Sequence, residues 1–135
     1  MATLLAHIRV HPGMEARFEE IAADMHQASH ARDRGLVRYE YWRGAEPGTY
    51  YALESFDDFL GFVEHQTSDH HEDATPAFRE VFADIRLEWV DPIQGSSPLV
   101  PTDGAELPAD ASELQAACYE RFAPLLVQPW WLPLR

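Results

Sequence analysis

Histidines are the residues of this chain best suited to proton transfer near neutral pH, and three of its seven lie close together in an acidic stretch. These are His65, His70 and His71. Metal-binding histidine pairs on one helix usually lie four residues apart, whereas His70 and His71 follow His65 by five and six residues. The spacing therefore predicts no metal site. We expect His70 to close the rim of a pocket or to bind a phenolic or anionic group, and His71 to face solvent.

A second pair, His26 and His30, does have the four-residue helical spacing, and Asp33 continues their line just beyond the predicted helix. This pattern could bind a transition metal at the surface. Without a third ligand close by in the sequence, we interpret the pair as the solvated flank of a helix. Because His26 follows Met25, which we expect in the core, His26 could also reach the edge of a pocket.

Aromatic side chains in the predicted strands indicate a site that stacks a ring. Alternation along each strand places half of them in the core or in a subunit contact, and the rest would form a flat pocket for a polycyclic substrate. Glu54 lies inside a strand, and we favour a structural hydrogen-bonding role for it because an unpaired buried charge is costly. The predicted substrate-binding residues are His26, Tyr39, Trp42, Tyr51, Glu54, Phe62 and Phe82.

Motifs for several other chemistries are missing. The chain has no Gly-rich phosphate loop, no Gly-x-Ser-x-Gly elbow and no paired-carboxylate motif. Its one cysteine, Cys118, rules out an intrachain disulfide and a cysteine-based zinc site, and we expect it to be a small buried residue. We therefore predict neither a bound cofactor nor a metal.

The periodicity of apolar residues predicts the elements that must position these side chains. Alternation indicates strands, and a spacing of three to four residues indicates helices. The predicted order is strand, helix, strand, strand, helix, helix, strand, at residues 3–11, 14–31, 36–43, 49–56, 57–66, 75–84 and 85–90, with a polar loop at 67–73. This order is typical of the ferredoxin-like split βαβ fold, an α+β fold with a four-stranded antiparallel sheet. Helices on one face leave the other bare, so we predict a homodimer.

The composition is that of one folded domain with 135 residues, of which 46% are hydrophobic. Ten basic side chains, all arginine, and 23 acidic ones give a net charge of −13, which would repel a nucleic-acid backbone. No apolar run approaches the ~20 residues of a membrane helix. The N-terminus carries no secretory signal. We expect a cytoplasmic protein that binds neither nucleic acid nor membrane.

Residues 94–135 differ in kind from the predicted domain at residues 1–93. A Pro-rich linker leads to a short helix near Leu114 and then to an apolar tail that contains Trp130 and Trp131. Such a tail should dock on the domain or on the dimer partner. The two roles left open for it are a lid over the pocket and a clamp on the second subunit.

Four stretches in the first 93 residues carry a family resemblance. They are residues 10–18 (VHPGMEARF), 33–40 (DRGLVRYE), 50–58 (YYALESFDD) and 62–70 (FVEHQTSDH). In this order and spacing they resemble the antibiotic biosynthesis monooxygenase family. The resemblance implies a dimeric α+β barrel with a pocket in each protomer between the helices and the sheet. Members include cofactor-free oxygenases of anthrones and quinols, an isomerase and haem-degrading enzymes.

His65 falls at the position where this family recurrently lines its pocket, often with a tryptophan. A histidine there could take a proton from a phenol or an acidic C–H group. The resemblance and the histidines together predict a cofactor-independent monooxygenase that oxidises an aromatic polyketide-like or quinol substrate with molecular oxygen, with His65 and His70 as catalytic residues. The alternatives are a proton-moving isomerase or cyclase on the same fold, and a non-catalytic dimeric barrel that binds a ligand or haem.

Overall fold

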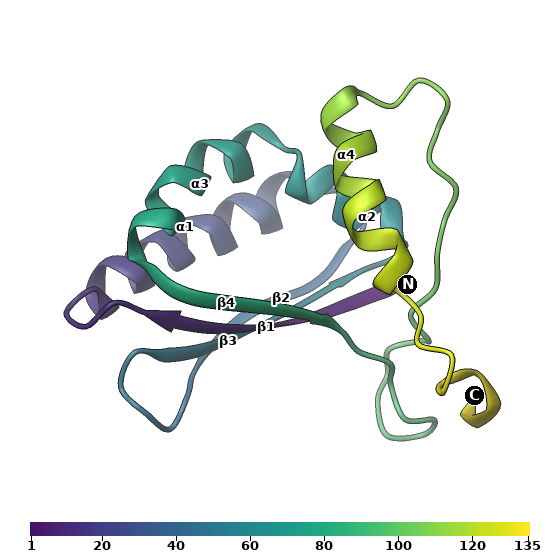
Figure 1. Cartoon of the computed structure of the whole chain (residues 1–135), viewed down its shortest axis with the longest axis horizontal. Helices are drawn as coiled ribbons and strands as arrows, with labels where there is room; N and C mark the ends of the chain where they lie inside the picture. Colours follow the sequence, from purple (N-terminus) through teal and green to yellow (C-terminus); the bar gives the residue numbers. More distant parts are fainter.

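The computed structural model describes residues 1–135 and shows one antiparallel sheet covered on one face by helices (Figure 1). The strands, in the spatial order β2-β3-β1-β4, are β1 (Ala2–Val10), β2 (Leu36–Arg43), β3 (Thr49–Phe56) and β4 (Phe82–Trp89). The helices are α1 (Glu15–Arg32), α2 (Phe59–Gln66), α3 (Asp69–Val81) and α4 (Glu113–Phe122). Two 3₁₀ turns follow α4, at 123–125 and 132–134. The predicted α+β fold is confirmed.

The third helix begins earlier than the sequence pattern predicts. α3 starts at Asp69, inside the stretch expected to be a loop, since the Ser68 hydroxyl caps it by accepting a hydrogen bond from a first-turn amide. Acidic side chains in that first turn interact favourably with the helix dipole. The helix also ends earlier, at Val81, because Phe82 already pairs with β1. The polar stretch is thus the start of α3.

Two clusters of buried side chains fill the space between the helices and the sheet. The first lies between α1, α3 and the sheet around Phe18, which is fully buried. The second lies at the other end of the sheet, where α2 and α4 meet, around Phe59 and Phe62 (Figure 1). Cross-strand registry between β1 and β3 puts Leu4, Ala6 and Ile8 on the side of the helices. The alternation predicted for the first strand is therefore correct.

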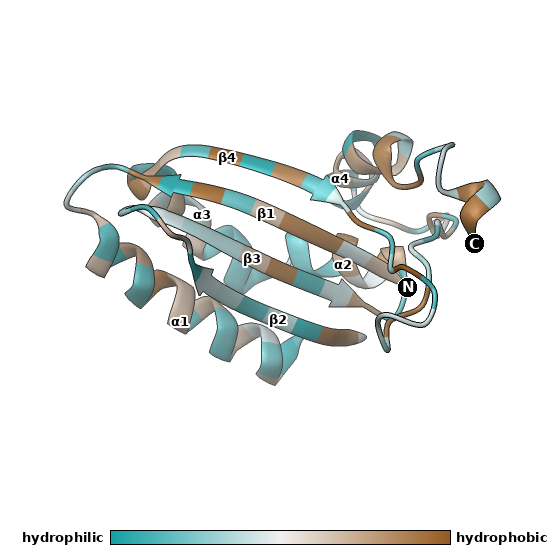
Figure 2. Ribbon diagram, turned by 90° about the horizontal axis from the view of Figure 1, so that it is seen from below, coloured by the Kyte–Doolittle hydropathy of each residue, from teal (hydrophilic) through white to brown (hydrophobic).

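The opposite face of the sheet carries no helix (Figure 2). Its side chains alternate with the buried ones along each strand, and they include the exposed aromatic rings of Trp42 and Tyr51. Leu5 and Leu53, which are opposite each other on β1 and β3, lie half-buried on the same face. Exposed aromatic rings on a sheet face without helices favour contact with another protein surface.

The C-terminal segment folds back on the end of the sheet. Thr102 is fully buried, and its hydroxyl donates a hydrogen bond to the Val90 carbonyl at 2.7 Å while accepting one from the Thr3 amide at 3.2 Å. Further along, Phe122 and Trp131 enter the second buried cluster, whereas Trp130 stays exposed. The tail therefore packs on its own protomer. No helix anywhere in the fold combines the length and apolar character that crossing a bilayer demands.

Candidate functional site

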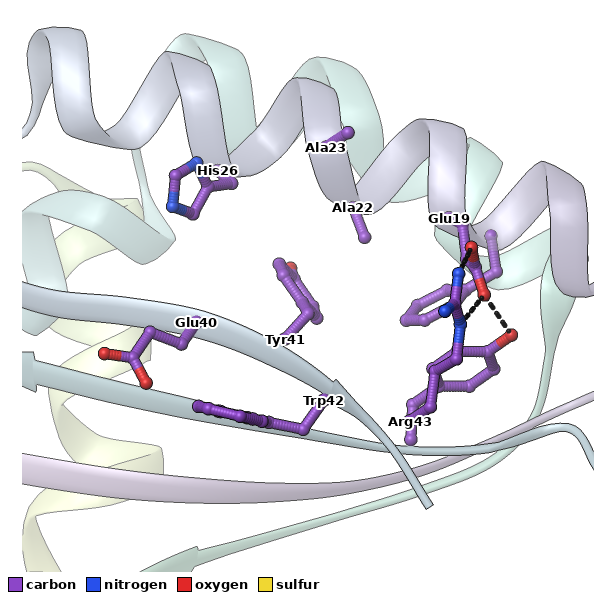
Figure 3. Close-up of a pocket in the computed structure, with 10 residues that line it drawn as sticks. Glu19, Ala22, Ala23, His26, Glu40, Tyr41, Trp42 and Arg43 are labelled. Atoms are coloured by element: carbon purple, nitrogen blue, oxygen red, sulfur yellow. Dashed lines mark hydrogen bonds and ion pairs between the residues drawn. The ribbon is translucent and has the colours of Figure 1, made fainter. Parts of the chain in front are cut away.

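An open cavity of about 690 Å³ lies between α1 and β2 (Figure 3). Its size suits a small aromatic molecule. Alanines and Phe18 give α1 a smooth apolar wall on one side. The side chains with chemical character around the cavity are Glu19, His26, Tyr41, Trp42, Arg43 and Tyr50.

One end of the cavity is a fixed polar group. The Arg43 guanidinium donates to both carboxylate oxygens of Glu19, at 2.7 and 2.6 Å, and the Tyr50 hydroxyl donates to the same carboxylate at 3.0 Å (Figure 3). The hydrogen bonds from Arg43 and Tyr50 lower the pKa of Glu19 to about 2. The carboxylate stays ionised across the physiological range, so this end keeps its charge pair.

The other end of the cavity carries an imidazole. His26 projects from α1 and Tyr41 from β2 into the space between the two elements (Figure 3). The ring of His26 is exposed, and its centre lies 4.2 Å from that of His30. His30 in turn contacts the Tyr39 carbonyl through Nε2 at 3.3 Å. His26 is thus the histidine that a molecule in this cavity would meet.

A pair of tyrosine hydroxyls lies behind the cavity wall. The hydroxyls of Tyr39 and Tyr41 are 2.6 Å apart, and both side chains are inside the protein. Burial raises the pKa of both hydroxyls above the ordinary tyrosine value, with a further rise from the nearby Glu54 carboxylate. Both therefore stay protonated. The ring of Tyr39 also packs edge-on against His65, with centres 5.3 Å apart.

A buried cluster of ionisable groups lies beyond these tyrosines, where α1 ends and α2 meets α3. His65 Nδ1 is 2.7 Å from Asp33 Oδ2, and His70 Nε2 is 3.1 Å from Asp33 Oδ1. His65 Nε2 lies 4.0 Å from Glu54 Oε2, which is beyond hydrogen-bonding distance. All four side chains are less than 10% exposed: 6% for Asp33, 1% for His65, 8% for His70 and 8% for Glu54.

Burial and pairing act differently on the acids of this cluster. Burial alone would raise the pKa of Asp33, but the hydrogen bond and charge of His65 and the charge of His70 outweigh it, and the pKa falls below the ordinary value. Glu54 has no hydrogen-bond partner, and burial raises its pKa despite the opposing charge of His65.

Burial together with the neighbouring histidines lowers the pKa of His71 to about 4. His71 is half-buried, with its Nδ1 enclosed, so the expectation that it faces solvent is wrong.

The structure divides the predicted site residues between several places. His26 and Trp42 border the cavity, whereas His65, His70 and Glu54 form the buried cluster. Tyr39 joins the two, through the Tyr41 hydroxyl on one side and the His65 ring on the other. The catalytic roles of His65 and His70 stay predictions.

Three predicted substrate contacts lie elsewhere and need correction. Tyr51 is on the bare face of the sheet, because its neighbours on β3 alternate toward the helices. Phe62 is fully buried in the second cluster, so no part of it is open to a ligand. Phe82 stacks on Phe78 in the first cluster, with ring centres 5.2 Å apart.

The predicted site residues do not include five residues of these sites, namely Glu19, Asp33, Tyr41, Arg43 and Tyr50. Tyr41 could have been found, because it shares strand parity with Tyr39 and so points to the same face. Asp33 was noted only as an extension of the His26 and His30 line. Its contact with His65 spans 32 positions, and no local pattern indicates it.

The split βαβ sheet with helices on one face and a cavity beneath α1 defines a ferredoxin-like α+β protein of the small-molecule-binding kind. Residues 1–84 match the antibiotic biosynthesis monooxygenase family, and the chain belongs to this family. The match ends before the C-terminal segment. The search of curated proteins found no match.

Solved structures show the same fold. A Caulobacter crescentus protein, assigned provisionally to the antibiotic biosynthesis monooxygenases, is 24% identical over 69% of this chain and 90% of its own, with a TM-score of 0.65. Rv0793 from Mycobacterium tuberculosis is 16% identical over 71% of this chain and 98% of its own, with a TM-score of 0.64. A Nitrosomonas europaea protein with the same provisional assignment as the first is 16% identical over 69% and 99%, again with a TM-score of 0.64. At these identities the likeness concerns the fold.

Proposed function

We propose that the protein is a monooxygenase that uses molecular oxygen to oxidise a small aromatic substrate with an acidic hydroxyl or methylene group, such as a quinol or an anthrone. The observation that carries the proposal is the cavity between α1 and β2, which sets an imidazole opposite aromatic rings. Family membership supports the reaction class. The substrate ring would stack on Tyr41, and its polar end would meet the Glu19–Arg43 pair.

His26 is the proposed proton acceptor. Its imidazole borders the cavity, and histidine is the side chain that most often serves as a general base. The resulting substrate anion passes one electron to oxygen, and the two radicals combine into a peroxide. Return of the proton and loss of water leave a carbonyl. A methylene group and O₂ thus become a carbonyl group and H₂O, so atoms and electrons balance.

Oxygen uptake by the chelator-treated protein with a panel of anthrones and hydroquinones tests this proposal. We expect turnover to fall about 100-fold in His26→Gln, the loss usual for a general base, with little change in substrate affinity. His11→Gln is the matched control, because His11 is exposed at the far end of β1. Uptake that survives in His26→Gln but is lost in His65→Gln would reject His26 and favour the catalytic role predicted for His65. No uptake with any substrate of the panel would contradict the proposed reaction.

We also propose that two copies pair through the bare face of the sheet. The exposed rings of Trp42 and Tyr51 on that face support this arrangement, as does the family's barrel architecture. The cavity would then open on the helix side of each subunit, away from the pairing surface.

A further inference from the structure

The buried cluster of Asp33, His65 and His70 is separate from the cavity and has a feature that the proposed reaction does not use. One ligand atom from each of these residues, a carboxylate oxygen and two imidazole nitrogens, lies within 4.8 Å of the other two. Two histidines and one carboxylate are a ligand set that divalent transition metals favour. The three residues come from three places in the chain, namely the end of α1, the end of α2 and the start of α3.

The hydrogen bonds of the metal-free cluster leave buried atoms without partners. His65 Nδ1 lies 2.7 Å from Asp33 Oδ2, and this contact leaves the second ring nitrogen, Nε2, without a partner. Nε2 faces Glu54 Oε2 across 4.0 Å, and neither atom has a hydrogen-bond partner. Two buried polar atoms without partners are unfavourable, and they indicate that the metal-free arrangement is incomplete.

A cation at Asp33 would correct this arrangement. Metal bound at His65 Nδ1 displaces the proton there, and the neutral imidazole then carries its proton on Nε2. A hydrogen on Nε2 points at Glu54 Oε2 and can form the carboxylate–histidine–metal arrangement that orients many metal ligands, after a small approach of the two side chains. The same cation would take the place of the contacts that His70 Nε2 makes with Asp33 Oδ1 and the Ser68 hydroxyl, 3.1 and 3.2 Å away.

We propose that Asp33, His65 and His70 form a binding site for one divalent transition-metal ion of the Zn²⁺ class, with Glu54 as the hydrogen-bond partner of His65. Atoms that each lie about 2.1 Å from one zinc ion are about 3 to 4 Å apart. The two contacts of Asp33, at 2.7 and 3.1 Å, need to open only slightly to reach that spacing.

The ion has a route from solvent. A surface hollow of about 370 Å³ is lined by Asp33 and His70 together with charged neighbours. Arg32 and Arg34 on its rim are offset by Glu64 and Asp69, so the hollow does not repel a cation strongly. The bound ion would have coordination positions open toward this hollow, and water molecules can fill these positions.

Zinc titration of the chelator-treated full chain by calorimetry tests the site, with the cobalt absorption spectrum as a second probe. We expect one ion per chain and a loss of affinity of at least about tenfold in both Asp33→Asn and His70→Gln. His30→Gln is the matched control, because it breaks the four-residue pair His26/His30 on the surface of α1 and should leave affinity unchanged. Circular dichroism confirms that each variant is folded before it is titrated.

The nitrogen spectrum of His65 gives a readout that a merely structural cluster would not change. Zinc bound at Nδ1 should shift the Nδ1 resonance of His65 and leave the ring proton on Nε2 in ¹⁵N-edited spectra of wild-type protein. The proposal is overturned if wild-type protein shows no saturable binding, if both variants bind as well as wild type, if only His30→Gln loses binding, or if the Nδ1 resonance of His65 does not shift. None of these readouts needs substrate, so failure of the proposed oxidation leaves them unaffected.

Discussion

Removing one hydroxyl of the buried Tyr39–Tyr41 pair should lower the free energy of unfolding more than removing both. Tyr41→Phe leaves the buried Tyr39 hydroxyl without its 2.6 Å partner, and we expect a loss of about 1–2 kcal/mol in the free energy of unfolding. The double variant Tyr39→Phe/Tyr41→Phe leaves no orphan and should regain most of that loss. Urea unfolding of the single and double variants measures the cycle. A double variant less stable than the Tyr41→Phe single variant would contradict this account.

Cys118 should be slow to react until the pH is well above neutral. Burial on α4 raises the pKa of its thiol to about 11, and only the thiolate is alkylated. Because the protonated form dominates below that pKa, we expect the rate with iodoacetamide to rise about tenfold per pH unit from about pH 8 to pH 10. Mass spectrometry follows the reaction, and urea-unfolded chain, with an ordinary thiol pKa, is the control. A rate that levels off below about pH 9 would show that the thiol is not shielded in this way.

At the scale of single elements, sequence reasoning succeeded where a pattern is local and failed where a contact is distant. Strand alternation and helix periodicity predicted β1, β2, β3 and α1 nearly residue by residue, because burial imposes those periods. The start of α3 was misplaced because its polar first turn has no apolar stripe and depends on the Ser68 cap. The prediction of no metal site rested on spacing within one helix and stays a prediction, but it did not consider Asp33, which follows α1 and meets His65 of α2 and His70 of α3. Only the folded chain shows that juxtaposition.

The attachment of the linker before α4 to the end of the sheet should depend on the buried side chain of Thr102. Thr102→Val keeps the volume nearly constant but leaves the Thr3 amide and the Val90 carbonyl without partners. We expect a loss of about 1–3 kcal/mol in the free energy of unfolding, with faster amide hydrogen exchange at Thr3. Ser97→Ala is the control, because Ser97 forms only a local bond with the Leu99 amide and should cost less than about 0.5 kcal/mol. Equal losses in the two variants would mean that Thr102 does not fasten the linker.

For the whole molecule, the charge distribution singles out the bare face of the sheet as the place where two copies can meet. The chain carries a net charge of −13, so two copies repel each other over most of their surface. The outward positions of the strands carry as many basic as acidic side chains. They are Arg9, Arg38 and Arg86, and Glu40, Asp84 and Glu88. Most of these charges are already paired within the face, as in the 2.8 Å contact of Arg38 with Glu40. Added salt should therefore strengthen the dimer by screening the rest of the surface.

Tyr51→Asp tests this pairing, because it puts a carboxylate in the middle of the predicted interface without touching the cavity or the cluster. Light scattering should give twice the chain mass of 15.4 kDa for wild type and the single-chain mass for the variant. Leu125→Asp, on the exposed part of the C-terminal segment, is the matched control and should stay dimeric. If Leu125→Asp dissociates the protein while Tyr51→Asp does not, the C-terminal segment clamps the second subunit and the bare face is not the interface. A wild-type protein with the mass of one chain at every salt concentration would exclude both arrangements.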